Sequence, residues 1–213
     1  MDEVFADRRE AGRRLARELL PLADQNPVVL ALPRGGVPVA REIAVALGAP
    51  LDILAVRKLG APGNPEYGVG AVAEDGSRVI DPEAVRQLGI GPEILDAIIA
   101  AETAELARRV AAYRGEQAPL ELTGRTVIVV DDGVATGVTD TAALRAVRRS
   151  GPERLILAVP VCPPDSIGLL RAEADEVICL ATPARFFGVG QQYRDFSQVS
   201  DQQVVSALEE LRD

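Results

Sequence analysis

A pair of adjacent aspartates stands at the end of one aliphatic segment of the chain. The stretch VIVVDDGVATGVTDTAA, residues 127–143, places Asp131 and Asp132 directly after four aliphatic residues and before a turn rich in glycine and threonine. Two like charges side by side at the end of a buried strand repel each other, so they need a ligand or a solvated turn to accommodate them. This pair therefore marks the first place where the chain could do chemistry.

The turn after the aspartates has the composition of a phosphate-binding loop. Residues 135–139, ATGVT, offer backbone N–H groups, two hydroxyls and a glycine that permits close approach, at the start of an expected helix. Because Asp131 and Asp132 would repel a phosphate, they suit a ligand that carries hydroxyls or a divalent cation beside its phosphate. A sugar phosphate has both features. The plain structural alternative is a capped strand-to-helix turn with a solvated aspartate pair, although one aspartate is enough to cap a helix.

Composition excludes several other kinds of site. Histidine is absent, which removes His-based triads and His-ligated zinc, and Cys162 and Cys179 show no metal-ligand spacing. No Walker A loop is present, and the GVGAVA stretch at residues 68–73 lacks the third glycine of a dinucleotide fingerprint. The formal net charge of −9 argues against a broad nucleic-acid surface. No apolar run is long enough to span a membrane and the charged start is not a signal peptide, so we expect a cytoplasmic protein.

The elements that must position the aspartates alternate between strands and helices. Short aliphatic runs predict strands, and apolar residues at helical spacing predict the helices between them. This order predicts an α/β fold, a doubly wound, mostly parallel sheet flanked by helices, in a single domain over residues 1–213. Strands are expected near residues 27–33, 51–57, 127–130, 155–161 and 176–181, and helices near 5–20, 37–48, 92–112, 138–150, 165–174 and 201–211.

One region is predicted to break this alternation. The run KLGAPGNPEYGVG, residues 58–70, is rich in glycine and proline and predicts a long loop. The following residues, 71–80, predict a hairpin that turns at Asp75 and Gly76. A loop of this length is uncommon in a compact domain unless it has a function. The segment contains four glycines and few large apolar residues to anchor it, so we expect residues 58–70 to be mobile or poorly ordered without a ligand.

The segment VIVVDDGVATGVT resembles the phosphoribosyl-diphosphate (PRPP) motif of type I phosphoribosyltransferases: an aliphatic strand, two acidic residues and a T-G-x-T phosphate loop. The resemblance implies that Asp131 and Asp132 meet the 2′- and 3′-hydroxyls of ribose, directly or through Mg²⁺. It also implies that the loop holds the 5′-phosphate. The expected PRPP-binding residues of this loop are Gly133, Ala135, Thr136, Gly137, Val138 and Thr139.

Two further segments resemble the same family. In ALPRGGVPVA, residues 31–40, Gly35 and Gly36 would let the backbone close on the diphosphate of PRPP, and Arg34 would neutralise it. An ordinary strand-to-helix turn is the alternative there. The segment RKLGAPGNPEYGVGAV, residues 57–72, resembles the mobile catalytic loop of the family, with Arg57 and Lys58 at its base and Glu66 within it. A plain surface loop is the alternative there.

The chain departs from many family members at Ala135. Many purine and orotate enzymes carry a third acidic residue at this position, where a carboxylate can handle a proton on the base. Another residue of this chain must therefore transfer the proton, and the resemblance makes Glu66 the nearest candidate.

The C-terminal part would form the family's variable hood over the acceptor, at about residues 181–200. Phe186, Phe187 and Tyr193 fall in this segment, where they either stack on a base or belong to the core. Over nearly its full length the chain is similar to a prokaryotic group of predicted phosphoribosyltransferases.

The resemblance implies a magnesium-dependent glycosyltransferase that transfers a pentosyl group. A nitrogenous base, such as a nucleobase, or a related acceptor would displace diphosphate from C1 of PRPP. Asp131, Asp132, Arg34, Lys58 and Glu66 would be its catalytic residues, and the two aspartates its metal ligands. The alternative is a regulatory protein of the same fold that senses PRPP or a nucleotide without turnover. A hydrolase using water as acceptor is a third hypothesis. The sequence leaves the acceptor and any homo-oligomer open.

Overall fold

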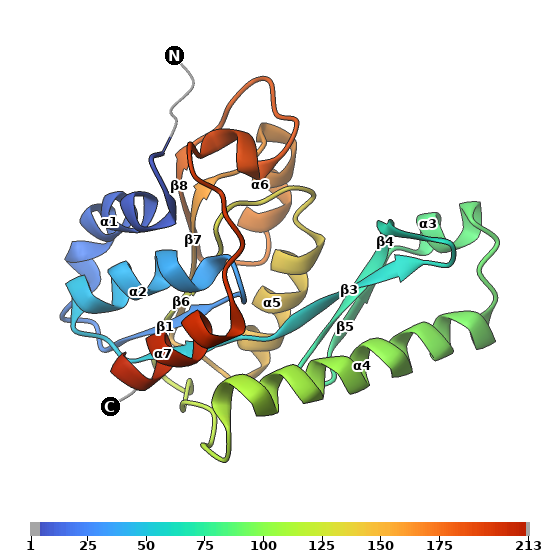
Figure 1. The fold of residues 1–213 in the computed structure, drawn as a ribbon, viewed down its shortest axis with the longest axis horizontal. Helices are drawn as coiled ribbons and strands as arrows, with labels where there is room; N and C mark the ends of the chain where they lie inside the picture. The colour runs from blue at the N-terminus through green and yellow to red at the C-terminus, as the bar shows by residue number, and fades with distance from the viewer. Residues whose placement is uncertain (1–4, 212–213) are drawn as a thin grey trace.

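The structure, a computed structural model, describes residues 5–211, except for the side chains of Pro65 and Glu66. Its centre is a five-stranded parallel sheet with the strand order β2-β1-β6-β7-β8, shown in Figure 1. Because all five strands are parallel, their carboxyl ends lie along one edge of the sheet. The strands are β1 (Pro27–Ala31), β2 (Leu51–Ile53), β6 (Thr126–Val130), β7 (Arg154–Val161) and β8 (Glu176–Ala181).

Helices cover both faces of this sheet, which confirms the predicted doubly wound α/β fold. One face packs against α1 (Arg8–Leu19), α2 (Gly36–Leu47) and α7 (Asp201–Leu211). The other face packs against α5 (Val138–Arg149) and α6 (Pro164–Arg171).

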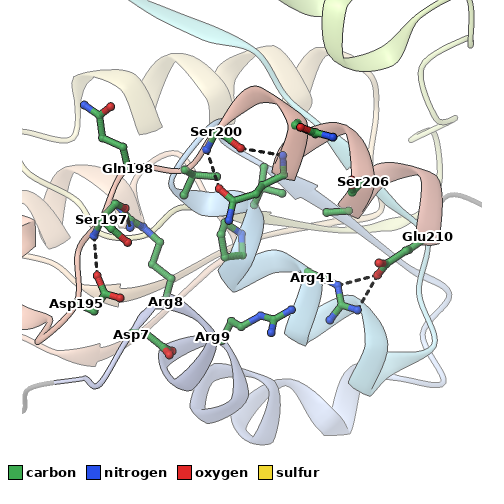
Figure 2. A pocket seen from close by; sticks show the side chains of 16 residues that line it. Asp7, Arg8, Arg9, Arg41, Asp195, Ser197, Gln198, Ser200, Ser206 and Glu210 are labelled. Carbon is green, nitrogen blue, oxygen red and sulfur yellow. Dashed lines mark hydrogen bonds and ion pairs between the residues drawn. The ribbon is translucent and has the colours of Figure 1, made fainter.

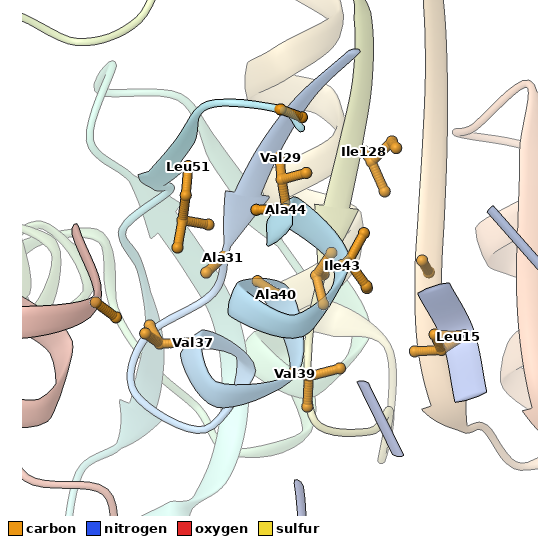
Figure 3. Close-up of a cluster of buried hydrophobic side chains, with 14 of the residues drawn as sticks. Leu15, Val29, Ala31, Val37, Val39, Ala40, Ile43, Ala44, Leu51 and Ile128 are labelled. Atoms are coloured by element: carbon orange, nitrogen blue, oxygen red, sulfur yellow. The ribbon is translucent and has the colours of Figure 1, made fainter. Parts of the chain in front are cut away.

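Successive side chains of the strands point to opposite faces of the sheet, so the core consists of two clusters, one on each face. In β1, Val29 and Ala31 face α2, whereas Val28 and Leu30 face α5. Figure 3 shows the α2 side, where Ile43 packs between the helix and the sheet. A strand buried on both faces needs apolar residues at every position, which is why β1 and β6 read as continuous aliphatic runs.

Glycine brings α1 unusually close to α2. A Cβ added at Gly12 would lie 2.6 Å from the carbonyl oxygen of Val39, so only glycine permits this approach. The close packing fixes where the first turn of α1, including Arg8, meets the sheet edge.

The prediction of a long loop at residues 58–70 is wrong. These residues form most of an antiparallel hairpin, β3 (Val56–Ala61) and β4 (Asn64–Ala73), which extends away from the core in Figure 1. Leu59 and Val69 are fully buried in a cluster with residues of the long helix α4. Four of the residues 58–70 are glycines, which have no side chain, so the alternation of buried and exposed residues was not visible in the sequence. The predicted turn at Asp75 and Gly76 is confirmed, and it joins β4 to β5 (Arg78–Ile80), followed by α3 (Pro82–Gln87) and α4 (Pro92–Arg114).

The single strand predicted at residues 51–57 is also wrong, because it is divided between two sheets. β2 ends at Ile53 in the parallel sheet, and β3 begins at Val56 in the second sheet. Leu54 and Ala55 between them are buried, so hydropathy gave no sign of the break.

A buried ion-pair network joins the second sheet to the core. Arg114, at the end of α4, donates from Nε to Asp52 Oδ1 at 3.2 Å and from Nη2 to Glu74 Oε1 at 3.0 Å. It also donates to the carbonyl oxygen of Ile53 at 2.9 Å. Asp52 belongs to β2 and Glu74 follows β4, so this one side chain links both sheets.

The segment 182–200 runs from β8 to α7 with a single turn of 3₁₀ helix, at Val189–Gln192. In Figure 1 it passes in front of α2 and reaches the side of the molecule on which α7 lies. Among residues 5–211, no helix combines the length and the apolar character that a membrane crossing requires.

Candidate functional site

The loops after β1 and β6 meet at the carboxyl edge of the sheet. The amide of Leu32 donates to the carbonyl oxygen of Val130 at 2.8 Å, which ties the two loops together. A Cβ added at Gly36 would lie 2.6 Å from that same oxygen, so the start of α2 can approach β6 only with glycine at this position. The sheet thus brings the predicted pyrophosphate loop against the aspartate pair.

Asp132 lies directly against this loop. A Cβ added at Gly35 would lie 2.0 Å from Asp132 Oδ2, which leaves no room for a side chain. The peptide bond between Pro33 and Arg34 is cis. The two glycines that the sequence singled out are therefore required by packing against the end of β6.

Asp132 has a partner that sequence analysis missed. Arg8, in the first turn of α1, donates from Nε to Asp132 Oδ2 at 2.7 Å, and both side chains are largely buried. The guanidinium group also donates to the carbonyl oxygen of Ser197 at 2.7 Å and lies 3.8 Å above the ring of Phe196. Arg8 thereby connects α1, the aspartate pair and the C-terminal segment.

Of the three aromatic residues singled out, Tyr193 belongs to the core. Its hydroxyl donates to the backbone carbonyl of Asp132 at 2.6 Å, and its ring contacts Phe5 and Phe196 at centroid distances of 5.5 and 5.1 Å. Burial holds the pKa of Tyr193 above its usual value. Phe187, in contrast, is 82% exposed.

The aspartates and a third carboxylate, Asp140, affect one another's ionisation. Burial raises the pKa of Asp131 well above its ordinary value, and the charges of Asp132 and Asp140 raise it further. Burial also raises the pKa of Asp132, whereas Arg8 lowers it. Asp140, in the first turn of α5, is 3% exposed, and burial raises its pKa to about 7. A ligand hydroxyl or a cation bound beside these residues would therefore interact with carboxyl groups that are poorly solvated by water.

The predicted phosphate loop lies directly before the N-terminus of α5. Ala135 and Thr136 are exposed, and Gly137 precedes α5 with a φ of 76°, in the left-handed region that favours glycine. The backbone N–H groups of the first helical turn have no partner within the helix and can bind a phosphate. Ser166, on α6, braces the loop by donating to the carbonyl oxygen of Ala135 at 3.1 Å.

The loop begins at Gly133, whose φ of 152° also lies in the range that side chains rarely adopt. A Cβ there would lie 2.6 Å from a methyl group of Val189 and 2.7 Å from one of Val161. Val138 and Thr139, which begin α5, are half-buried.

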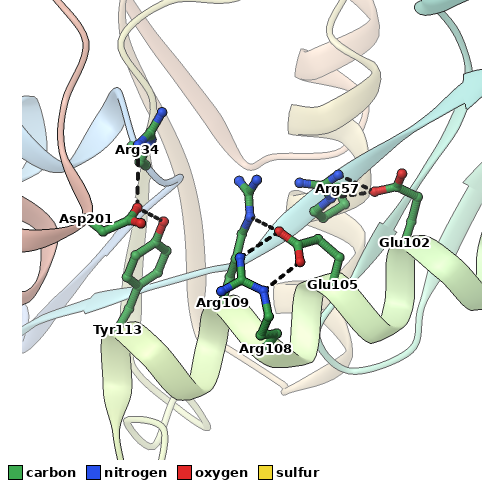
Figure 4. A network of polar contacts seen from close by, with 8 residues as sticks. All are labelled: Arg34, Arg57, Glu102, Glu105, Arg108, Arg109, Tyr113 and Asp201. Atoms are coloured by element: carbon green, nitrogen blue, oxygen red, sulfur yellow. Dashed lines mark hydrogen bonds and ion pairs between the residues drawn. The ribbon is translucent and has the colours of Figure 1, made fainter.

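Arg34, in the loop after β1, belongs to a polar network with residues of α7 and α4, shown in Figure 4. Its guanidinium group is 3.5 Å from Asp201 Oδ1, at the start of α7, and that carboxylate accepts a 2.6 Å hydrogen bond from the hydroxyl of Tyr113. Arg34 is thus held by a carboxylate that a ligand could replace.

The two remaining predicted residues lie on the second sheet. Lys58 is part of β3, and its side chain runs along Gly68, where a Cβ would lie 3.1 Å from Lys58 Cδ. Glu66 lies in β4, but its side chain is outside the described residues, so its predicted role stays a prediction.

A cavity of about 570 Å³ adjoins the aspartate pair through Arg8 (Figure 2). It lies between the first turns of α1 and α2, the segment 195–200 and α7. Arg41, on α2, is paired across it with Glu210, on α7.

The aspartates fit one mode of magnesium binding. They supply carboxylate oxygens, the ligands that Mg²⁺ prefers, but within the described part of the chain no cluster of three or more His, Cys, Asp or Glu side chains could hold a metal. Asp132 also accepts a hydrogen bond from Arg8. The residues therefore fit an ion that takes most of its ligands from water and substrate phosphates.

Comparison with known proteins gives one consistent result. The phosphoribosyl transferase domain family matches residues 3–195. Two strain variants of a Mycobacterium tuberculosis protein, "Putative phosphoribosyl transferase" MT0597 and Rv0571c, are 48% identical over 207 residues, which is 97% of this chain. The match covers only 47% of each relative, so the chain spans about half their length.

Solved structures agree with the fold. The crystal structure of TT1426 from Thermus thermophilus matches 99% of this chain and 100% of its own length, with a TM-score of 0.83 and 45% identity. A Neisseria gonorrhoeae protein solved with bound ppGpp matches 99% of this chain and 98% of its own, with a TM-score of 0.51. At 14% identity, that likeness concerns the fold alone.

Proposed function

The chain belongs to the phosphoribosyl transferase domain family, and from this premise we propose that it transfers the phosphoribosyl group of PRPP to a nitrogenous base or a related acceptor. In this reaction the acceptor nitrogen forms a bond to C1 of ribose, the bond from C1 to diphosphate breaks, and diphosphate leaves with the bonding electron pair. We propose that magnesium accompanies the diphosphate.

The observation that carries this proposal is the junction of two loops at the sheet edge. Asp132 packs against Gly35 so closely that no Cβ fits between them, and the loop leading to α5 begins directly after Asp132. A ligand bridging these loops would place one phosphate at the N-terminus of α5, hydroxyls near the aspartates and a diphosphate beside Arg34. PRPP carries these groups in this order.

The chain's own residues would act by position and charge. Cationic character develops on the ribose ring as the bond to diphosphate breaks, and the half-buried side chains of Asp131 and Asp132 would stabilise it in their ionised form. Arg34 and Lys58 would stabilise the departing diphosphate. A bound magnesium ion would supply further neutralisation of the diphosphate. No covalent nucleophile is needed in this scheme.

The acceptor and its proton remain proposals. Glu66 is the proposed proton carrier, since Ala135 provides no carboxylate in the phosphate loop. The exposed Phe187 and the segment 182–200 lie after β8, where they could contribute to acceptor binding.

One observation favours the alternative of a PRPP-sensing protein without turnover. Asp132 already accepts a hydrogen bond from Arg8, so ligand binding would change a contact that reaches Phe196 and Ser197 in the C-terminal segment. Such a connection could report the presence of a ligand without chemistry.

A turnover assay separates these functions. The protein is incubated with PRPP and Mg²⁺, alone and with each of a panel of nucleobases, and diphosphate is followed. Release only with one base supports transfer, whereas release without any base supports hydrolysis. Calorimetric binding of Mg-PRPP with no release under any condition supports sensing. Absence of both binding and release would refute the use of PRPP.

A further inference from the structure

Three arginines from distant segments of the chain gather beside the long helix α4. Arg34 follows β1, Arg57 lies on β3 and Arg109 lies on α4. Figure 4 shows Arg109 between the other two. The guanidinium group of Arg34 lies 3.5 Å from Asp201 Oδ1, and the charges of Arg34 and Arg109 both lower the pKa of Asp201, after the larger effect of its hydrogen bond from Tyr113.

A cavity of about 420 Å³ joins Arg109 to β3. It is lined by the cations Arg57, Lys58 and Arg109 and by one carboxylate, Glu102, together with small and apolar residues of α4 and β3. Of the two residues already assigned to the diphosphate, Lys58 lines this cavity together with Arg109, whereas Arg34 lies beside the start of α7, 3.5 Å from Asp201 Oδ1. Neither the sequence motifs nor the family resemblance drew attention to α4.

Each of the three arginines is held by a carboxylate. Asp201 lies 3.5 Å from Arg34, Glu102 pairs with Arg57, and Glu105 accepts from Arg109 at 2.8 Å. All three pairs are partly exposed, so they contribute little to stability and can exchange partners. A polyanion can therefore replace the carboxylates at modest cost.

We propose that Arg109 of α4 is a binding residue for the leaving diphosphate, completing a site formed with Arg34, Arg57 and Lys58. This inference rests on the proposed function. An arginine presents a planar fork of donors that matches phosphate oxygens in pairs, which suits a group with several of them. The hydrogen bond from Tyr113 to Asp201 links α4 to the start of α7, close to Arg34.

The neighbouring Arg108 provides a matched control. It donates to the same carboxylate, Glu105, at 2.7 Å, but its side chain is 66% exposed against 39% for Arg109, and it does not line the cavity. Replacing either residue breaks an ion pair with Glu105. Only replacement of Arg109 removes a cation from the proposed site.

The test measures calorimetric affinity for inorganic diphosphate with Mg²⁺ and, separately, for ribose 5-phosphate. Arg109→Gln should weaken diphosphate binding by about tenfold or more, the equivalent of one charge-assisted hydrogen bond. Arg108→Gln should change it by less than about twofold. Arg109→Lys should lie between them, because it keeps the charge and loses the fork. Ribose 5-phosphate should bind all three variants like the parent protein.

The outcomes separate this inference from the proposed function. The inference would be overturned if Arg109→Gln and Arg108→Gln bound diphosphate with equal affinity. It would also be overturned if Arg109→Gln lost as much affinity for ribose 5-phosphate as for diphosphate. If the parent protein bound ribose 5-phosphate and not diphosphate, the inference would fail while the phosphate loop and aspartate assignments stood. Binding of neither probe would refute both proposals.

Discussion

Arg8 Nε lies 2.7 Å from Asp132 Oδ2, and this contact joins the first helix of the chain to the acidic pair 124 positions later. The guanidinium group is held from its other side by the ring of Phe196 and the carbonyl oxygen of Ser197. Burial raises the pKa of Asp132, and Arg8 opposes this effect. Arg8 therefore favours the ionised form of Asp132, in which both oxygens can accept hydrogen bonds.

Arg8→Ala should weaken ribose 5-phosphate binding at neutral pH by about tenfold, because the loss of Arg8 favours the protonated form of Asp132, which has less acceptor capacity. The loss should shrink as the pH rises and Asp132 ionises again. Calorimetry between pH 6 and pH 9 measures this dependence. Arg9→Ala, at an exposed position on the same helix, is the control. Tighter binding in Arg8→Ala would mean that Arg8 competes with the ligand.

Gly35→Ala should disturb Asp132 directly, because the added Cβ would lie 2.0 Å from its Oδ2. The carboxylate must move, which breaks its alignment with Arg8 and should cost about 1–3 kcal/mol of folding stability. Affinity for ribose 5-phosphate should fall with it. Urea denaturation and calorimetry measure the two effects. Gly168→Ala, where a Cβ has open space, should change neither; a neutral Gly35→Ala would contradict the close contact.

The central sheet and its aspartate loop could be predicted because their signals are local. β6 is buried on both faces, so its residues are continuously aliphatic, and the loop after it is short. Arg8 could not be predicted in this way. Helical periodicity identifies the apolar face of residues 5–20, but it cannot tell which polar side chain reaches a loop far along the chain.

The second sheet escaped prediction for a different reason. Residues 58–70 contain glycine at several positions, and a glycine leaves no side chain to display the two-residue period of a strand. At Gly70 a Cβ would lie 2.3 Å from the carbonyl oxygen of Val79, so close strand packing requires the residue that suggested a loop. The role of α4 in holding this hairpin depends on tertiary contacts alone.

Asp131→Asn and Asp132→Asn should each lower the affinity for Mg-PRPP by about tenfold or more, because each replaces a carboxyl oxygen that could accept from a ribose hydroxyl by an amide donor. Asp131→Asn should not lower the unfolding free energy at neutral pH, since burial and the charges of Asp132 and Asp140 raise the pKa of Asp131. Calorimetry and urea denaturation provide the measurements. Asp165→Asn, at an exposed position of α6, is the control. Unchanged Mg-PRPP affinity in both variants would refute the ribose assignment.

Arg114→Ala should destabilise the protein strongly. The change leaves Asp52, which is 1% exposed, without its buried cation, and removing one partner of a buried pair costs about 3–5 kcal/mol. Arg108→Ala, on the exposed side of the same helix, should cost less than about 1 kcal/mol. Urea denaturation at neutral pH compares the two. Similar unfolding free energies for Arg114→Ala and Arg108→Ala would show that the network does not hold the second sheet to the core.

Asp140→Asn should change how stability depends on pH. Burial raises the pKa of Asp140 from 3.8 to about 7, so between these values the unfolded chain releases a proton that the folded protein keeps. The unfolding free energy of the parent protein should therefore fall across this range as the pH rises. The asparagine cannot ionise, so the unfolding free energy of the variant should not show this part of the decline. The variant should exceed the parent in unfolding free energy by the largest amount above pH 7. Urea denaturation at pH 5 and pH 8 measures the difference, with Asp96→Asn, at an exposed position of α4, as the control. Parallel pH profiles for the parent and Asp140→Asn would show that Asp140 is ionised in the folded protein.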